Sequence, residues 1–198
     1  MQMDTKTLSI TIVFVAVTVA LNPAISQIAI PFPLLPFLIY QIWEIPIVAA
    51  FVLIGRKVGV LIAVLNTAIL TIFFPGALPT GPLYNLAATL SMLLGIYVIQ
   101  KILKNKKPIE THQNYSDYTK SKFVMFATAL GMILRVVIMT LVNYVSLRYP
   151  YPIGFELNET AIIGSLPLTG LFNATLALYT IPIGLFIAKA INKNLKLK

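Results

Sequence analysis

The chain alternates long apolar stretches with short polar breaks, and this pattern predicts helices that cross a membrane. Six apolar stretches are separated by charged residues or by clusters of Pro and Gly, at residues 8–30, 38–54, 58–74, 83–103, 121–146 and 166–190. A helix that crosses a bilayer needs about 20 apolar residues. We therefore predict an all-α polytopic membrane protein, with residues 1–198 forming one domain of six transmembrane helices.

The first two predicted spans are joined by an unusual apolar loop. Asn22 and Pro23 interrupt the first span, and proline kinks or ends a helix because it lacks a backbone donor. Residues 25–40 contain three further prolines and cannot form a regular helix, although they are almost wholly apolar. We expect this first loop to fold over the outer end of the bundle. Arg56 and Lys57 leave room for only a tight turn between the second and third spans, which predicts a helical hairpin.

Composition excludes a water-soluble domain. Hydrophobic residues make up 58% of the chain and charged residues 11%, whereas roughly a quarter of an ordinary soluble domain is charged. The mean hydropathy is +0.88. There is no cysteine, which rules out thiolate chemistry, cysteine-ligated zinc and disulfides.

The net charge of +9 is explained by topology, so we expect no nucleic-acid partner. Lysine and arginine in short loops stay on the cytoplasmic side of a membrane. With both termini cytoplasmic, all 15 basic residues except Arg135 and Arg148 lie inside. The polar residues 104–122 then form a cytoplasmic linker, and the single histidine, His112, is a surface residue within it.

Motifs for catalysis or ATP hydrolysis are missing from the sequence. It has no Gly-x-x-x-x-Gly-Lys phosphate loop, no His-Glu-x-x-His metal motif and no nucleophile elbow. We therefore expect no enzyme, no catalytic residue, no metal and no cofactor. Energy for any transport has to come from a partner or from an ion gradient.

Arg135 is the clearest functional candidate, because it lies about 20 Å along a helix from the nearest basic residue on either side. An arginine at mid-membrane costs about 2.5 to 3.5 kcal/mol on an insertion scale. It should therefore face the bundle interior or a wet cavity and have a partner, either pinning helices together or contacting a ligand. Met139, Asn143 and Ser146 follow on roughly the same helix face.

Glu44 opens the second predicted helix, where an acidic residue offsets the positive end of the helix dipole. It is also the natural counter-charge to Arg135, or a ligand acceptor. Amides at Asn66, Asn85 and Asn173 either join helices or, together with Asn143 and nearby aromatic rings, form a pocket for a planar polar molecule. The candidate substrate-binding residues are Trp43, Glu44, Tyr84, Asn85, Arg135, Asn143, Tyr144, Phe172 and Asn173.

The first span also carries small residues at a spacing of four, namely Ala16, Ala20 and Ala24. Small residues in register let another helix approach closely in lipid. This surface either packs within its own bundle or docks a partner helix.

Together these features resemble the S components of energy-coupling factor (ECF) vitamin transporters, the membrane subunits that capture a vitamin for an ATP-driven module. The similarity covers nearly the whole chain. Within that family, Glu44-Ile45-Pro46 and the stretch from Arg135 to Asn143-Tyr144 are most similar to the riboflavin-type members.

The resemblance implies a substrate-capture subunit in the plasma membrane of a prokaryote, with riboflavin or a related flavin as ligand rather than cofactor. It also implies a transmembrane coupling subunit and two ATPase subunits as partners, and it assigns Ala16, Ala20 and Ala24 to the docking surface. Pro82-Leu83-Tyr84 and Ala174-Thr175 replace an acidic residue and a lysine that riboflavin-type members tend to have. The alternatives are therefore an S component for another heterocyclic vitamin or nucleobase-like compound, and a membrane enzyme or assembly factor.

Overall fold

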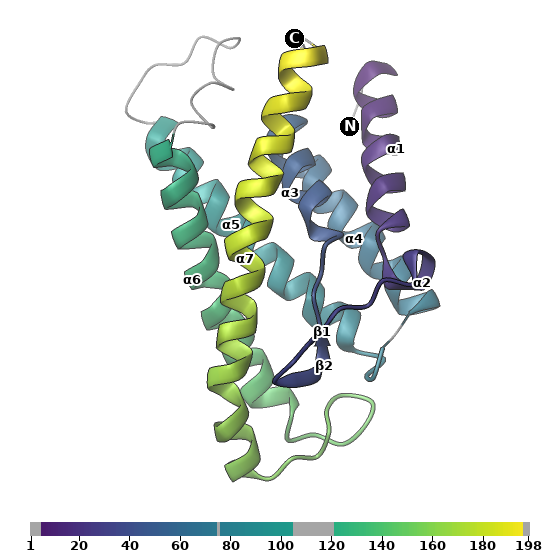
Figure 1. The fold of residues 1–198 in the computed structure, drawn as a ribbon, viewed down its shortest axis with the longest axis vertical. Helices are drawn as coiled ribbons and strands as arrows, with labels where there is room; N and C mark the ends of the chain where they lie inside the picture. The colour runs from purple at the N-terminus through teal and green to yellow at the C-terminus, as the bar shows by residue number, and fades with distance from the viewer. Residues whose placement is uncertain (1–4, 75, 105–120, 196–198) are drawn as a thin grey trace.

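The computed structural model describes residues 5–74, 76–104 and 121–195, which form a mostly helical bundle (Figure 1). Residues 105–120 of the predicted linker, including His112, lie outside the described residues. The described elements are α1 (Thr5–Ala20), α2 (Pro23–Ser26), β1 (Pro31–Phe32), β2 (Leu35–Ile39), α3 (Glu44–Leu53), α4 (Arg56–Phe73), α5 (Gly81–Lys104), α6 (Ser121–Ser146) and α7 (Glu159–Leu195).

Among the described residues, four helices are long and apolar enough to cross a membrane, namely α4, α5, α6 and α7. They match the predicted spans at residues 58–74, 83–103, 121–146 and 166–190, although α7 begins seven residues earlier than predicted, at Glu159. The side chain of Asn158 accounts for this start, because its Oδ1 accepts the backbone N–H of Ala161 at 2.8 Å and so caps the helix. The chain is thus a membrane protein with at least four candidate spans.

The first two predicted spans, residues 8–30 and 38–54, are too long as continuous helices. The first helix, α1, ends at Ala20, and α2 adds only a single turn that begins at Pro23. The second, α3, begins at Glu44 and has 10 residues, or about 15 Å of the roughly 30 Å hydrocarbon thickness. Prolines explain why both helices are shorter than predicted, because a proline restricts the residue before it and supplies no N–H to a helix.

The first loop contains a short antiparallel hairpin of β1 and β2, which an all-α prediction did not include. The hairpin pairs Pro31 with Ile39 and Phe32 with Leu35, with an irregularity between the two pairs. Proline's fixed φ suits extended backbone, and a two-stranded ribbon at an edge tolerates its missing donor. The apolar first loop is therefore ordered, and it packs against the middle of α7 through Phe32, Phe172 and Leu176.

Helix α3 forms the core of the bundle. Every residue from Pro46 to Leu53 is buried, and the helix packs against α1, α4 and α7. Gly184 lets α3 and α7 approach closely, because an added Cβ there would lie 2.7 Å from Val48 Cγ1. Because α3 packs against three helices, neighbouring elements shield it despite its short length.

The start of α1 and the end of α7 lie at the same end of the bundle, where α5 ends and α6 begins (Figure 1). The helix ends at this side of the bundle carry the basic residues Arg56, Lys101, Lys122 and Lys193. Arg56, at the start of α4, stacks over the ring of Tyr97 in α5 at 4.5 Å. The opposite end carries the loop between α6 and α7 and Arg148. The charge asymmetry read from the sequence is therefore also an asymmetry between the two ends of the bundle.

Candidate functional site

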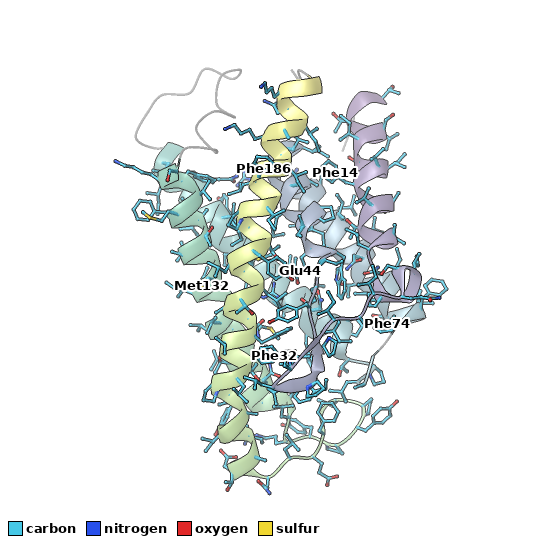
Figure 2. The ribbon with its side chains drawn as sticks, in the orientation of Figure 1. Phe14, Phe32, Glu44, Phe74, Met132 and Phe186 are labelled. Atoms are coloured by element: carbon cyan, nitrogen blue, oxygen red, sulfur yellow. The ribbon has the colours of Figure 1, made fainter. Side chains whose placement is uncertain are left out.

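A cavity of about 170 Å³ opens in the half of the bundle away from the chain termini. It is bordered by β2 and the residues that follow it, the end of α4, the start of α5, the second half of α6 and the middle of α7. Figure 2 shows Glu44 near mid-height in the bundle and Phe32 of the hairpin below it. The cavity therefore lies where the predicted first loop meets the polar residues of the helices.

A fully buried ion pair lies beside the cavity. Arg135 Nη1 donates to Glu44 Oε2 at 2.5 Å, and neither side chain is exposed. Both parts of the prediction for Arg135, an interior position and a partner, are confirmed. The pair joins α6 to the first residue of α3, where the carboxylate also offsets the helix dipole.

Three further side chains contact the guanidinium, among them Met92, whose Sδ lies 3.8 Å from Nη1. Arg135 Nε donates to Asn173 Oδ1 at 3.1 Å, and Nη2 donates to Gln41 Oε1 at 2.8 Å. Asn173 is itself held in place, because its Nδ2 donates to the carbonyl of Thr169 at 2.9 Å. A buried charge is tolerated better when an opposite charge and further acceptors surround it in this way.

The hydroxyl of Thr89 lies 2.9 Å from the other carboxylate oxygen of Glu44, Oε1, and 2.9 Å from the backbone carbonyl of Asn85. Thr89 lies on α5, one turn after Asn85, whose Oδ1 is 3.3 Å from the same hydroxyl. The Arg135 network, which we define as Arg135, Glu44, Gln41, Thr89 and Asn173, thus connects α3, α5, α6 and α7 with the segment between β2 and α3.

Aromatic side chains form the walls of the cavity. Trp43, Tyr84 and Phe172 line it, and Trp43 and Phe172 are each only 3% exposed. Phe172 is held by two rings of the first loop, with centroid distances of 5.4 Å to both Phe32 and Tyr40. The Trp43 indole N–H has no hydrogen-bond acceptor among the described residues. Aromatic walls with a few polar groups are typical of sites for planar ligands.

The hairpin and the α6–α7 loop meet beside the cavity. The ring centroids of Phe37 and Phe155 lie 5.4 Å apart, and both residues line the cavity. The hydroxyl of Tyr84 donates to the carbonyl of Ile153 at 2.8 Å, which ties the loop to α5. The expected position of the first loop over one end of the bundle agrees with this arrangement.

The structure brings most of the predicted binding residues together. All of them line the cavity except Glu44, which lies directly behind Arg135, and Tyr144. Tyr144 is 37% exposed and points elsewhere, because its hydroxyl donates to Glu159 Oε1 at 3.0 Å and Arg148 lies over its ring. Met139, Asn143 and Ser146 share the face of Arg135 that borders the cavity, as the helical spacing predicted.

Sequence reasoning missed Gln41 and Thr89. Gln41 carries a signal, because it is a polar residue inside an apolar loop and precedes Glu44 by three positions. Thr89 carries none, since a threonine within an apolar helix ordinarily bonds to its own backbone. Phe37 and Phe155 were also missed, because their contact depends on how two distant loops meet.

Two other predicted features lie away from the cavity. Asn66 accepts a hydrogen bond from Asn22 Nδ2 at 2.9 Å, so it joins α4 to the junction between α1 and α2. Ala16 and Ala20 are exposed on α1, whereas Ala24 belongs to α2. The three alanines therefore do not form one continuous helical stripe, because the helix ends between the second and the third.

The cavity offers hydrogen bonds and aromatic surface, and the described residues contain no group of three or more potential metal ligands. Its lining is suited to binding an organic molecule. No family model matches the chain, and no curated protein matches it.

Proposed function

We propose that this protein is the substrate-capture subunit of an ECF-type vitamin transporter and binds riboflavin or a related flavin in the cavity. The observation that carries the proposal is the Arg135 network beside an aromatic-walled cavity. A flavin ring has flat faces for stacking and polar edges for hydrogen bonds, and both kinds of partner are present. The sequence resemblance to riboflavin-type S components supports the same ligand.

The proposal includes six membrane crossings with both termini in the cytoplasm of a prokaryotic cell. Helix α1 and the short α3, which the apolar first loop precedes, would supply the two remaining crossings next to the four long ones. The basic residues at the end of the bundle that holds both termini support a cytoplasmic location for that end. The cavity would then open to the outside, where a vitamin is captured.

Delivery would require partners, because the sequence has no phosphate loop for ATP. We propose a transmembrane coupling subunit and two ATPases. Helix α1 supports a docking role, since it exposes Leu8, Ile12, Val13 and Val17 alongside Ala16 and Ala20. Such a face is compatible with a close helix partner in lipid.

The size of the cavity adds a requirement for ligand access. Sites for drug-sized ligands occupy about 300 to 1,000 Å³, and the cavity has about 170 Å³. A flavin therefore needs the hairpin or the α6–α7 loop to move outward. Contacts such as Phe37 with Phe155 would have to open and close again.

Purification of the full-length protein tests the proposal directly. Trp43 is the only tryptophan in the chain and lines the cavity, so its emission reports on the site. Riboflavin at micromolar concentration should quench both Trp43 emission and the flavin's own fluorescence. An absence of quenching, with no yellow flavin co-purifying, would contradict the flavin assignment. Binding of a different heterocycle in the same assay would favour the alternative S component.

A further inference from the structure

The charge of the cavity lining is balanced within the protein. Arg135 is the only formally charged side chain among the described residues that line the cavity. Its guanidinium is paired with Glu44 at 2.5 Å, with both side chains fully buried. Gln41 and Asn173 each present an oxygen to the remaining sides of the guanidinium. A ligand therefore meets a neutral ion pair rather than a free cation.

The start of α5, which also borders the cavity, offers no free backbone N–H groups that could bind an anion in place of Arg135. Helix N-termini bind anions through free backbone N–H groups. Here the amide of Gly81 donates to Leu78, and those of Leu83 and Tyr84 donate to Thr80. Pro82 has no N–H to offer. The first turn of this helix is thus already satisfied by the protein.

An anion that approached Arg135 would also lie close to the Glu44 carboxylate. It would compete with the Gln41 and Asn173 oxygens for the guanidinium and remain beside a like charge in a site removed from water. Repulsion between like charges is strong where water is excluded. A neutral group carries no such penalty, because it brings no like charge beside the carboxylate.

We infer that the cavity selects an uncharged ligand over its phosphorylated form, and that Glu44 is the residue that determines this specificity. The inference rests on the proposed function, because it concerns the ligand of the same cavity. Glu44 acts through Arg135, so it is a positioning and charge-setting residue that need not touch the ligand.

A comparison of riboflavin with riboflavin 5′-phosphate tests the inference on the full-length protein in detergent. The wild type should bind riboflavin at least about tenfold more tightly than the phosphate, which corresponds to about 1.4 kcal/mol. Equal affinities, or tighter binding of the phosphate, would overturn the inference and leave flavin capture standing.

Substitutions at the ion pair separate charge from structure. Glu44→Gln frees the charge of Arg135 and should shift the affinity ratio at least about tenfold toward the phosphate. Glu44→Gln combined with Arg135→Gln leaves no formal charge and should restore the preference for the uncharged ligand. Glu44→Asp is the matched control, because it keeps the charge and the preference. An unchanged ratio in folded Glu44→Gln protein would contradict the role of Glu44.

Failure of both flavins to bind would contradict the proposed function alone. The charge of the cavity can then be tested by a measurement that needs no ligand. Acrylamide, which is uncharged, and iodide, an anion, both quench tryptophan emission, and Trp43 is the sole tryptophan. Iodide quenching should be weak in the wild type and should rise in Glu44→Gln, while acrylamide quenching stays the same. Iodide quenching that exceeds acrylamide quenching in the wild type would overturn the inference even if Glu44→Gln does not fold.

Discussion

Arg135 and Glu44 lie 91 positions apart in the chain, yet Nη1 of the guanidinium is 2.5 Å from Oε2 of the carboxylate inside the bundle. The pair connects α6 to the first residue of α3. Its position beside the cavity means that one interaction both holds helices together and sets the charge that a ligand meets. The two roles are separable by experiment.

The structural role predicts a large loss of stability when only one partner is removed. Arg135→Met leaves the Glu44 carboxylate buried without its cation, and breaking a buried pair costs about 3 to 5 kcal/mol. Adding Glu44→Gln should recover most of that loss, because no uncompensated charge remains. Unfolding of the purified protein in detergent by denaturant measures both values.

The exposed pair of Arg148 and Glu159 provides the control for this experiment. These side chains are 39% and 54% exposed and 3.4 Å apart. Arg148→Met should leave the unfolding midpoint nearly unchanged, since exposed pairs contribute little. Equal losses for Arg135→Met and for the double variant would mean that the pair is not energetically coupled.

The topology prediction is that both termini and the basic end of the bundle face the cytoplasm. Because the chain has no cysteine, a single introduced cysteine is its only thiol. Tyr151→Cys, at a position that is 70% exposed in the α6–α7 loop, should react with a membrane-impermeant maleimide on intact cells. Lys193→Cys, near the end of α7, should react only after permeabilisation. Labelling of both on intact cells would rule out the six-span arrangement.

The extent to which the sequence predicts the site depends on whether a contact is local. The face of α6 follows from a rotation of about 100° per residue, which places Met139 and Asn143 near Arg135. The same arithmetic puts Tyr144, nine positions on, about 180° away, and the structure finds it exposed. The prediction that Tyr144 belongs to the binding site therefore conflicted with the helical period itself.

Contacts between distant segments were harder to predict. The Glu44 partner could be guessed because few opposite charges are available within the spans, but Gln41 and Thr89 needed the packing of the first loop and α5. The hairpin was missed for a different reason. Its prolines signal the absence of helix but do not specify which extended residues pair.

The docking prediction concerns α1. Ala20 is exposed, and Ala20→Trp should prevent a partner helix from approaching closely, so that uptake is lost while riboflavin binding by the isolated protein stays intact. Leu178→Trp is the matched control, because Leu178 is 58% exposed on α7 and should tolerate the same bulk. Uptake assays in cells that contain the coupling module, with titrations on purified protein, make the comparison. Equal effects of the two variants would place the docking surface elsewhere.

Asn143 provides the most direct test of the binding site. It lines the cavity, and its Nδ2 donates to the carbonyl of Met139 at 2.7 Å within α6, which leaves its Oδ1 available to a ligand. Loss of one buried hydrogen-bond partner costs about 1 to 3 kcal/mol, or roughly 5- to 150-fold in Kd. Asn143→Leu should weaken riboflavin binding by that factor, because it keeps much of the volume and adds no charge.

Tyr144→Phe is the control for Asn143→Leu, since Tyr144 is the next residue of α6 and its hydroxyl bonds to Glu159 away from the cavity. It should leave the Kd for riboflavin unchanged. Fluorescence titration of the two purified variants and the wild type gives the comparison, and size-exclusion chromatography verifies that each is folded. A normal Kd for folded Asn143→Leu would remove Asn143 from the site, and a weakened Kd for Tyr144→Phe would show that the ligand reaches a face of α6 that the cavity does not include.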